Sequence, residues 1–81
     1  MEERVINRVK LYVNDNDKSK KVADDLRAEL KKYKFKIVDE DPELVISVGG
    51  DGSFLRMVKD MRFNPNIYYI GVNSGTLGFL Q

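Results

Sequence analysis

The sequence contains neither cysteine nor histidine. Without cysteine, the chain can have no disulfide, no thiolate metal site and no thiol nucleophile. Without histidine, it cannot form a Ser-His-Asp triad, and it has no imidazole base and no ordinary zinc site. Any chemistry must therefore use carboxylates, hydroxyl groups, amides, the backbone or a bound cofactor.

Long hydrophobic runs and an excess of charge of one sign are also absent. The longest apolar stretch, Leu44 to Gly50, has the length of a strand and falls far short of the roughly 18 residues of a membrane span. The 14 basic and 13 acidic residues leave a net charge of +1. Neither nucleic acid nor a membrane is therefore expected as a partner. No signal peptide is evident, and a cytoplasmic location is expected.

The 81 residues, of which 42% are hydrophobic and 33% charged, are predicted to form a single domain. Residues 9–13 alternate between apolar and polar side chains, which predicts a strand. Asp17 or Ser19 is predicted to cap a helix that runs to about residue 33, since apolar residues recur there at helical spacing. Residues 35–38 are predicted to form a short second strand.

The second half of the chain has the strongest strand pattern. Residues 44–48 are apolar except for Ser47 and mostly β-branched, which predicts a central strand of a parallel sheet, buried on both faces. A second helix is predicted from about Ser53, and one face of it is expected to carry Phe54, Leu55, Val58 and Met61. Residues 67–72 are predicted to form another buried strand. The alternation of strands and helices predicts an α/β fold, with a mostly parallel sheet flanked by helices.

The connection between the second and third predicted strands does not fit this pattern. Its five residues are too few for the helical crossover that parallel neighbours normally need. The second strand is therefore either a short edge strand or not parallel to the others.

The segment Gly49-Gly50-Asp51-Gly52-Ser53 joins the predicted central strand to the second helix. Open α/β sheets bind ligands at the carboxyl ends of their strands. Glycines permit a positive φ and a close approach to the backbone, and the first N–H groups of a helix attract anions. The alternative is a tight turn kept small for packing. The segment is neither a Walker loop nor a dinucleotide fingerprint, because no Lys follows the glycines directly and Leu55 stands at the third glycine position.

Asp51 is the candidate catalytic residue. A carboxylate beside an anion site repels phosphate unless a Mg²⁺ ion or a substrate hydroxyl lies between them. Both arrangements belong to phosphoryl transfer. The alternative is that Asp51 only caps the second helix. No metal site is expected within the chain itself, since the acidic residues 39–43 lack the spacing of a calcium loop. Any Mg²⁺ contact of Asp51 would be indirect.

Two segments resemble known motifs. Gly49 to Ser53 resembles the GGDG(S/T) signature of NAD kinases, diacylglycerol and sphingosine kinases, and phosphofructokinases. Residues 70–80, Ile-Gly-Val-Asn-Ser-Gly-Thr-Leu-Gly-Phe-Leu, resemble the G-(I/V)-N-x-G-x-L-G-F-L stretch of NAD kinases. The resemblance to NAD kinases implies that Asp51 is catalytic, as a proton acceptor or metal organiser. It also implies that the nucleotide is bound by Gly49, Gly50, Asp51, Gly52, Ser53, Asn73, Gly75, Leu77, Gly78 and Phe79.

The same resemblance implies an activity and its partners. A phosphoryl group would pass from ATP or inorganic polyphosphate to the 2′-hydroxyl of the adenosine ribose of NAD, giving NADP, with a divalent cation such as Mg²⁺. A second, β-rich domain would be missing after Gln81, and the full-length enzyme would be a homo-oligomer. The 81-residue chain alone is therefore expected to be inactive. The alternatives are a lipid or sugar kinase of the same superfamily and a stand-alone nucleotide-binding module.

Overall fold

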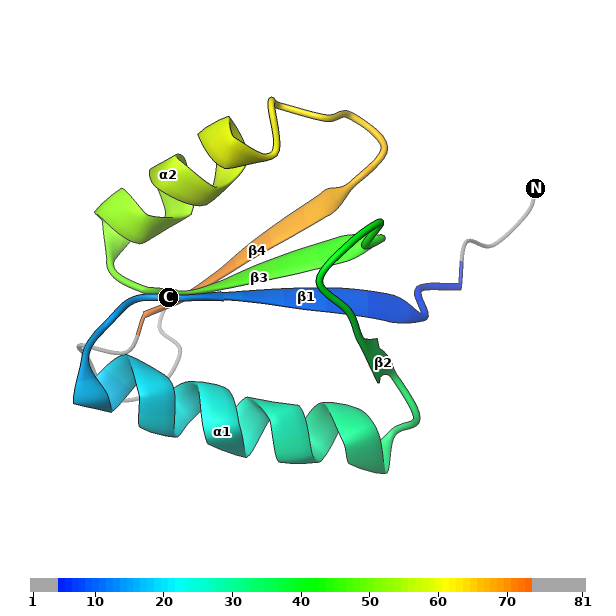
Figure 1. Ribbon diagram of the computed structural model, residues 1–81, viewed down its shortest axis with the longest axis horizontal. Coiled ribbons are helices and arrows are strands. Elements are labelled where there is room, and N and C mark those ends of the chain that lie inside the picture. The colour runs from blue at the N-terminus through cyan, green and yellow to red at the C-terminus, as the bar shows by residue number, and fades with distance from the viewer. Residues whose placement is uncertain (1–4, 74–81) are drawn as a thin grey trace.

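The computed structural model describes residues 5–73, apart from the side chain of Asp51. The elements in chain order are β1 (Arg8–Val13), α1 (Asp17–Lys32), β2 (Lys36–Ile37), β3 (Leu44–Gly49), α2 (Asp51–Asp60) and β4 (Tyr68–Asn73). The strands form one parallel sheet in the order β2-β1-β3-β4. α1 and α2 cover opposite faces of this sheet (Figure 1). The predicted α/β fold is confirmed.

β3 is the central strand, as predicted. It pairs in parallel with β1 on one side and β4 on the other, and all six of its residues are buried. Leu44, Ile46 and Val48 pack with Ala23 of α1 in the main core. Successive side chains of a strand point to opposite faces, so the fully buried Val45 faces α2. Because helices cover both faces, this strand is apolar along almost its whole length.

The start of α1 differs from the prediction. Asn16 is the N-cap, and its side-chain oxygen accepts a hydrogen bond from the Ser19 N–H at 2.8 Å. The prediction of Asp17 or Ser19 as the cap is therefore wrong. Asn16 has the extended backbone that an N-cap requires, with φ −151°, whereas Asp17 already belongs to the helix. The helix ends at Lys32, close to the predicted end.

β2 is a two-residue strand at the edge of the sheet, which decides between the two alternatives left open by the sequence. It is parallel to β1, and it lies on the side of β1 that is away from β3. Val9 of β1 pairs with Ile37 of β2 and also with Leu44 of β3. Residues 38–43 therefore only cross the start of β1, and no helical crossover is needed.

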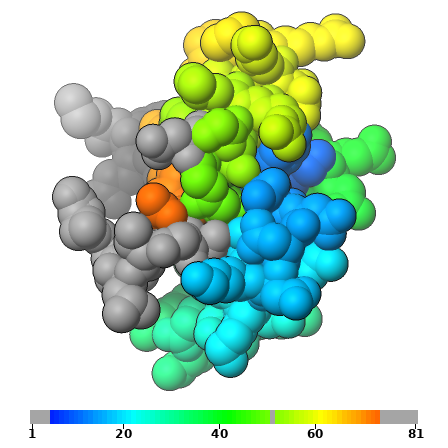
Figure 2. Space-filling view, turned by 90° about the vertical axis from the view of Figure 1, so that its left-hand side faces the viewer, coloured from blue at the N-terminus to red at the C-terminus, as the bar shows by residue number. Residues whose placement is uncertain are grey.

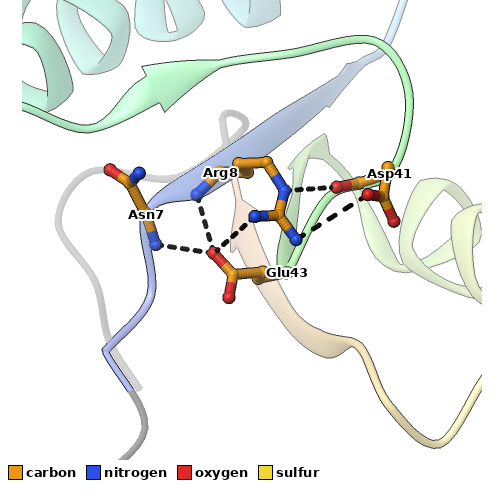
Figure 3. A network of polar contacts seen from close by, with 4 residues as sticks. All are labelled: Asn7, Arg8, Asp41 and Glu43. Carbon is orange, nitrogen blue, oxygen red and sulfur yellow. Dashed lines mark hydrogen bonds and ion pairs between the residues drawn. The ribbon is translucent and has the colours of Figure 1, made fainter.

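Polar contacts around Glu43 fasten this crossing segment to β1 (Figure 3). The Glu43 Oε1 atom accepts hydrogen bonds from the N–H groups of Asn7 (2.9 Å) and Arg8 (3.1 Å). The same oxygen lies 3.8 Å from the Arg8 guanidinium. Arg8 Nε also donates to the Asp41 carbonyl at 2.8 Å. Asp41 has φ 56°, a left-handed backbone that is uncommon outside glycine and marks the tight turn.

β4 lies at the other edge of the described sheet, and the prediction that it is buried is wrong. Each of its residues is exposed or half-buried. Ile70 is 48% exposed, whereas its register partner Ile46 in β3 is 5% exposed. An apolar strand pattern does not distinguish a central strand from an edge strand, because it carries no information on how many neighbours the strand has.

The buried face of α2 also differs from the prediction. Ser53 and Met57, one helical turn apart, are the buried residues, whereas Leu55 is 64% exposed. Leu55 stands two positions from Met57, about 200° around the helix, and therefore does not share the buried side of α2. The helix begins at Asp51, two residues before the predicted start. Within residues 5–73, neither helix has the length and apolar character needed to cross a bilayer.

Candidate functional site

The carboxyl ends of β1, β3 and β4 meet at one edge of the sheet, where both helices begin (Figures 1 and 2). Asn14 follows β1, and its N–H donates to the Val48 carbonyl at 2.9 Å. Gly49 ends β3 and is the register partner of Asn73, which ends β4. The parallel register therefore brings the glycine turn beside the motif that starts at Ile70.

The glycines at this edge serve two different purposes. A Cβ atom on Gly49 would lie 2.6 Å from Ser53 Oγ and 2.9 Å from Asn14 Cβ. Gly49 thus allows α2 and the end of β1 to approach β3 closely, which confirms the close-packing interpretation at this position. A Cβ atom on Gly50 or Gly52 would meet no described atom within 4 Å, so the described part of the chain leaves the backbone there open to a ligand.

The predicted use of a positive φ in this turn is wrong. None of the described glycines lies in the left-handed region, and Gly50 has an extended backbone with φ −101° and ψ −171°. Gly49 is therefore needed for space and not for an unusual conformation.

The start of α2 fixes the position of Asp51. Gly50 is the N-cap, and its carbonyl accepts hydrogen bonds from the N–H groups of Ser53 (3.1 Å) and Phe54 (3.3 Å). The N–H groups of Asp51 and Gly52 come before the first intrahelical hydrogen bonds. They lie at the positive end of the helix dipole. Asp51 is the first helical residue, so the alternative in which it is the N-cap is wrong.

A cavity of about 410 Å³ opens beside the glycine turn. This volume lies in the range of small-molecule sites, roughly 300–1,000 Å³. Its described walls carry no charged side chain. They come from β3, α2 and β4 and consist of Ser47, Gly49, Gly50, Phe54, Leu55, Gly71, Val72 and Asn73.

Besides Asp51, whose side chain lies outside the described part of the chain, the predicted site residues fall into three groups. Gly49, Gly50 and Asn73 line the cavity. Gly52 and Ser53 belong to the first turn of α2 but are not among the described walls, and Ser53 is buried against Gly49. The predicted residues that lie outside the described part of the chain are Gly75, Leu77, Gly78 and Phe79.

Sequence reasoning did not identify several residues of this edge. Ser47 and Gly71 are register partners on the face under α2, and Phe54 packs over Gly71, where an added Cβ would lie 3.0 Å from its ring. The sequence contained a signal for Ser47, because it is the polar residue in an otherwise apolar predicted strand. Asn14 could have been found because it directly follows a predicted strand. The other cavity residues that were missed are Leu55 and Val72.

The described residues do not form a metal centre by themselves. Within residues 5–73, leaving aside the side chain of Asp51, no group of three or more acidic side chains is placed to hold a metal ion. Asp60, at the far end of α2 from the glycine turn, accepts a hydrogen bond from the Tyr12 hydroxyl. This hydrogen bond, with a smaller effect of burial, raises the pKa of Tyr12 above its usual value. The contact ties β1 to α2 and is not part of the cavity.

Comparison with known proteins identifies the family. The model of the ATP-NAD kinase N-terminal domain matches residues 1–81. An NAD kinase of Finegoldia magna is 40% identical over 76 residues, which cover 90% of this chain and 28% of the relative. An NAD kinase of Lactococcus lactis subsp. cremoris is 41% identical over 73 residues, 89% of this chain and 27% of the relative. The chain thus spans little more than a quarter of these relatives, and by its match over its full length it belongs to the NAD kinase family.

Proposed function

We propose that this chain forms the nucleotide-binding part of an NAD kinase. In that reaction a phosphoryl group passes from ATP or inorganic polyphosphate to the 2′-hydroxyl of the adenosine ribose of NAD, giving NADP. The observation that supports this most directly is the register pair of Gly49 and Asn73, which joins the two motifs at one edge of the sheet. That edge is where open α/β sheets bind nucleotides. The family match favours this reaction over a lipid or sugar kinase.

The start of α2 is the proposed phosphate site. The N–H groups of Asp51 and Gly52 stand at the positive end of the helix, and no side chain at Gly50 or Gly52 blocks the approach. We place Asp51 as the proton acceptor. The ribose 2′-oxygen forms a bond to the terminal phosphorus, the bond from phosphorus to the leaving oxygen breaks, and the carboxylate takes the hydroxyl proton.

The divalent cation is not assigned a resident site in this chain, because the described residues lack a suitable acidic cluster. Mg²⁺ commonly binds through substrate phosphates, retained waters and only one or two carboxylates. We propose that the cation enters with the phosphate groups of the donor and contacts Asp51 only indirectly.

NAD and the phosphoryl donor are the proposed partners. The rest of the NAD pocket would come from a second, β-rich domain, since the matched relatives are more than three times as long as the segment they share with this chain. We expect the 81-residue chain alone to form no NADP.

The proposal can be tested in a chimaera in which this chain replaces the matched segment of the Finegoldia magna NAD kinase. NADP formation is measured with ATP and with polyphosphate in separate assays. We expect Asp51→Asn to lower the rate by roughly 10²–10⁴-fold, the contribution of a general base. Asp60→Asn makes the same chemical change at the far end of α2, and it should leave the rate unchanged. A rate for Asp51→Asn within a few-fold of the unsubstituted chimaera would contradict the assignment.

A further inference from the structure

The cavity beside the glycine turn has a polar residue in its wall that the proposed reaction does not use. Ser47 lies in the middle of β3 and is only 1% exposed, yet it lines the cavity. Its neighbours along the strand from Leu44 to Val48 are all apolar. A hydroxyl group carries one hydrogen-bond donor and two acceptor lone pairs. Such a group in an apolar strand lowers stability unless a partner satisfies it.

Backbone and an aromatic ring surround the side of Ser47 that lines the cavity. Its register partner is Gly71, which contributes no side chain beside the Ser47 hydroxyl. The Phe54 ring packs onto Gly71, with ring atoms 3.0–3.7 Å from the position of an added Cβ. The space beside Ser47 is thus bordered by an aromatic ring and by open backbone.

The described walls favour a neutral group over a phosphate. Phe54, Leu55 and Val72 are apolar, and the polar wall residues, Ser47 and Asn73, are uncharged. A phosphate drawn in beside Ser47 would lose its hydration without gaining a cation. The phosphates are better placed at the mouth, where Gly50 leads into the first N–H groups of α2.

Resting on the proposed function, we propose that Ser47 is a specificity-determining residue. Its hydroxyl hydrogen-bonds the polar edge of a neutral heterocyclic ring of the bound nucleotide, while the phosphates stay at the start of α2. The competing interpretation is that Ser47 is merely small enough for Phe54 to pack over the sheet. The two interpretations predict different results. A hydrogen bond to a ring affects only ligands that carry a ring, whereas a packing role affects ligands with and without a ring alike.

The test compares two ligands in binding titrations of the Finegoldia magna chimaera described above. NAD carries both rings and phosphates, whereas inorganic tripolyphosphate carries phosphate alone. We expect Ser47→Ala to weaken NAD binding by roughly two- to tenfold, the loss of one hydrogen bond, and to leave tripolyphosphate binding unchanged. Ser47→Thr keeps a hydroxyl and should retain most of the NAD affinity. Ser19→Ala removes another fully buried hydroxyl, at the start of α1, and should leave NAD affinity unchanged.

The possible outcomes separate this inference from the function on which it rests. If the unsubstituted chimaera does not bind NAD at millimolar concentration, the proposed function and this inference both fail. If it binds NAD and Ser47→Ala binds equally well, the function stands and the role of Ser47 is overturned. An equal loss of NAD and tripolyphosphate affinity would show that Ser47 acts through packing, which also overturns the inference.

Discussion

β3 and β4 are neighbouring parallel strands of six residues each, yet their environments differ sharply. β3 is paired on both sides and buried at every position, whereas no residue of β4 is fully buried. Ile46 and Ile70 share a residue type, a register and a face of the sheet, but they are 5% and 48% exposed. The burial of each isoleucine is therefore set by the position of its strand in the sheet and not by the residue type.

The largest expected effect comes from truncating these two isoleucines. Ile46→Ala should lower the free energy of unfolding by about 2–5 kcal/mol, because it leaves a cavity in the packed core. Ile70→Ala should cost about 1 kcal/mol or less, since half of that side chain already contacts solvent. Urea denaturation of both variants measures the difference. Equal losses would show that β3 and β4 are equally buried in solution and would remove the contrast.

The glycines of the two strands sharpen the contrast. Gly49→Ala would place a Cβ atom within 3.0 Å of atoms from both Ser53 and Asn14, so we expect a loss of about 1–3 kcal/mol from overpacking. The nearest atoms to a Cβ atom in Gly71→Ala are those of the Phe54 ring, none closer than 3.0 Å, so its loss should be smaller. Thermal unfolding of the two variants tests the order. A larger loss for Gly71→Ala would mean that β4, and not β3, is the more tightly packed strand.

The residues that lead into the two strands also differ. Glu43, just before β3, accepts two backbone N–H groups with a carboxylate oxygen, and we expect Glu43→Ala to cost about 1.5–3 kcal/mol. Asn64, before β4, accepts the N–H of Asn66 with a neutral amide oxygen. Asn64→Ala should cost about 1 kcal/mol. Urea denaturation in low salt and in high salt is informative, because only the loss at Glu43 should shrink with salt.

The smallest effect extends the comparison to β1, the other neighbour of β3. The hydrogen bond from Tyr12 to Asp60 raises the pKa of Tyr12 above its ordinary value of 10.0. Its contribution to stability is therefore complete below pH 10.0 and is lost as the pH rises through the raised pKa. As the pH rises in the alkaline range, the free energy of unfolding should fall by a small amount, and Tyr12→Phe should not show this fall. Tyr33→Phe, which removes an exposed phenol, should keep that loss.

The parts of the fold that could be predicted are those set by local sequence. The β-branched run at residues 44–48 identified the central strand, and the glycines after it identified a turn into a helix, because both signals lie within a few residues. The burial of β4 could not be predicted in this way, since it depends on which strands lie beside it. The cap at Asn16 was missed because several adjacent residues have side chains suited to capping.

The candidate site was predictable only where a motif marked it. The glycine turn and Asn73 were found as motifs. They lie side by side because of the parallel register of β3 and β4, which the spacing of residues along the chain does not specify. Ser47 and Gly71 become neighbours only through the same register. Leu55 was placed on one helix face with Phe54, Val58 and Met61, yet it is exposed and lines the cavity, because helical periodicity does not say which face meets the sheet.

The double pairing of β3 also has a consequence for local opening of the chain. An amide of β3 exchanges its hydrogen only when contacts to β1, β4 and both helices are broken, so it should be among the slowest to exchange. The glycine turn is attached to this slow element, whereas Asn73 ends a strand with far less protection. Of the two motifs that meet at this edge, one is therefore attached to the most protected strand, and the other begins in a strand that should open more readily than β3 and can adjust to a ligand.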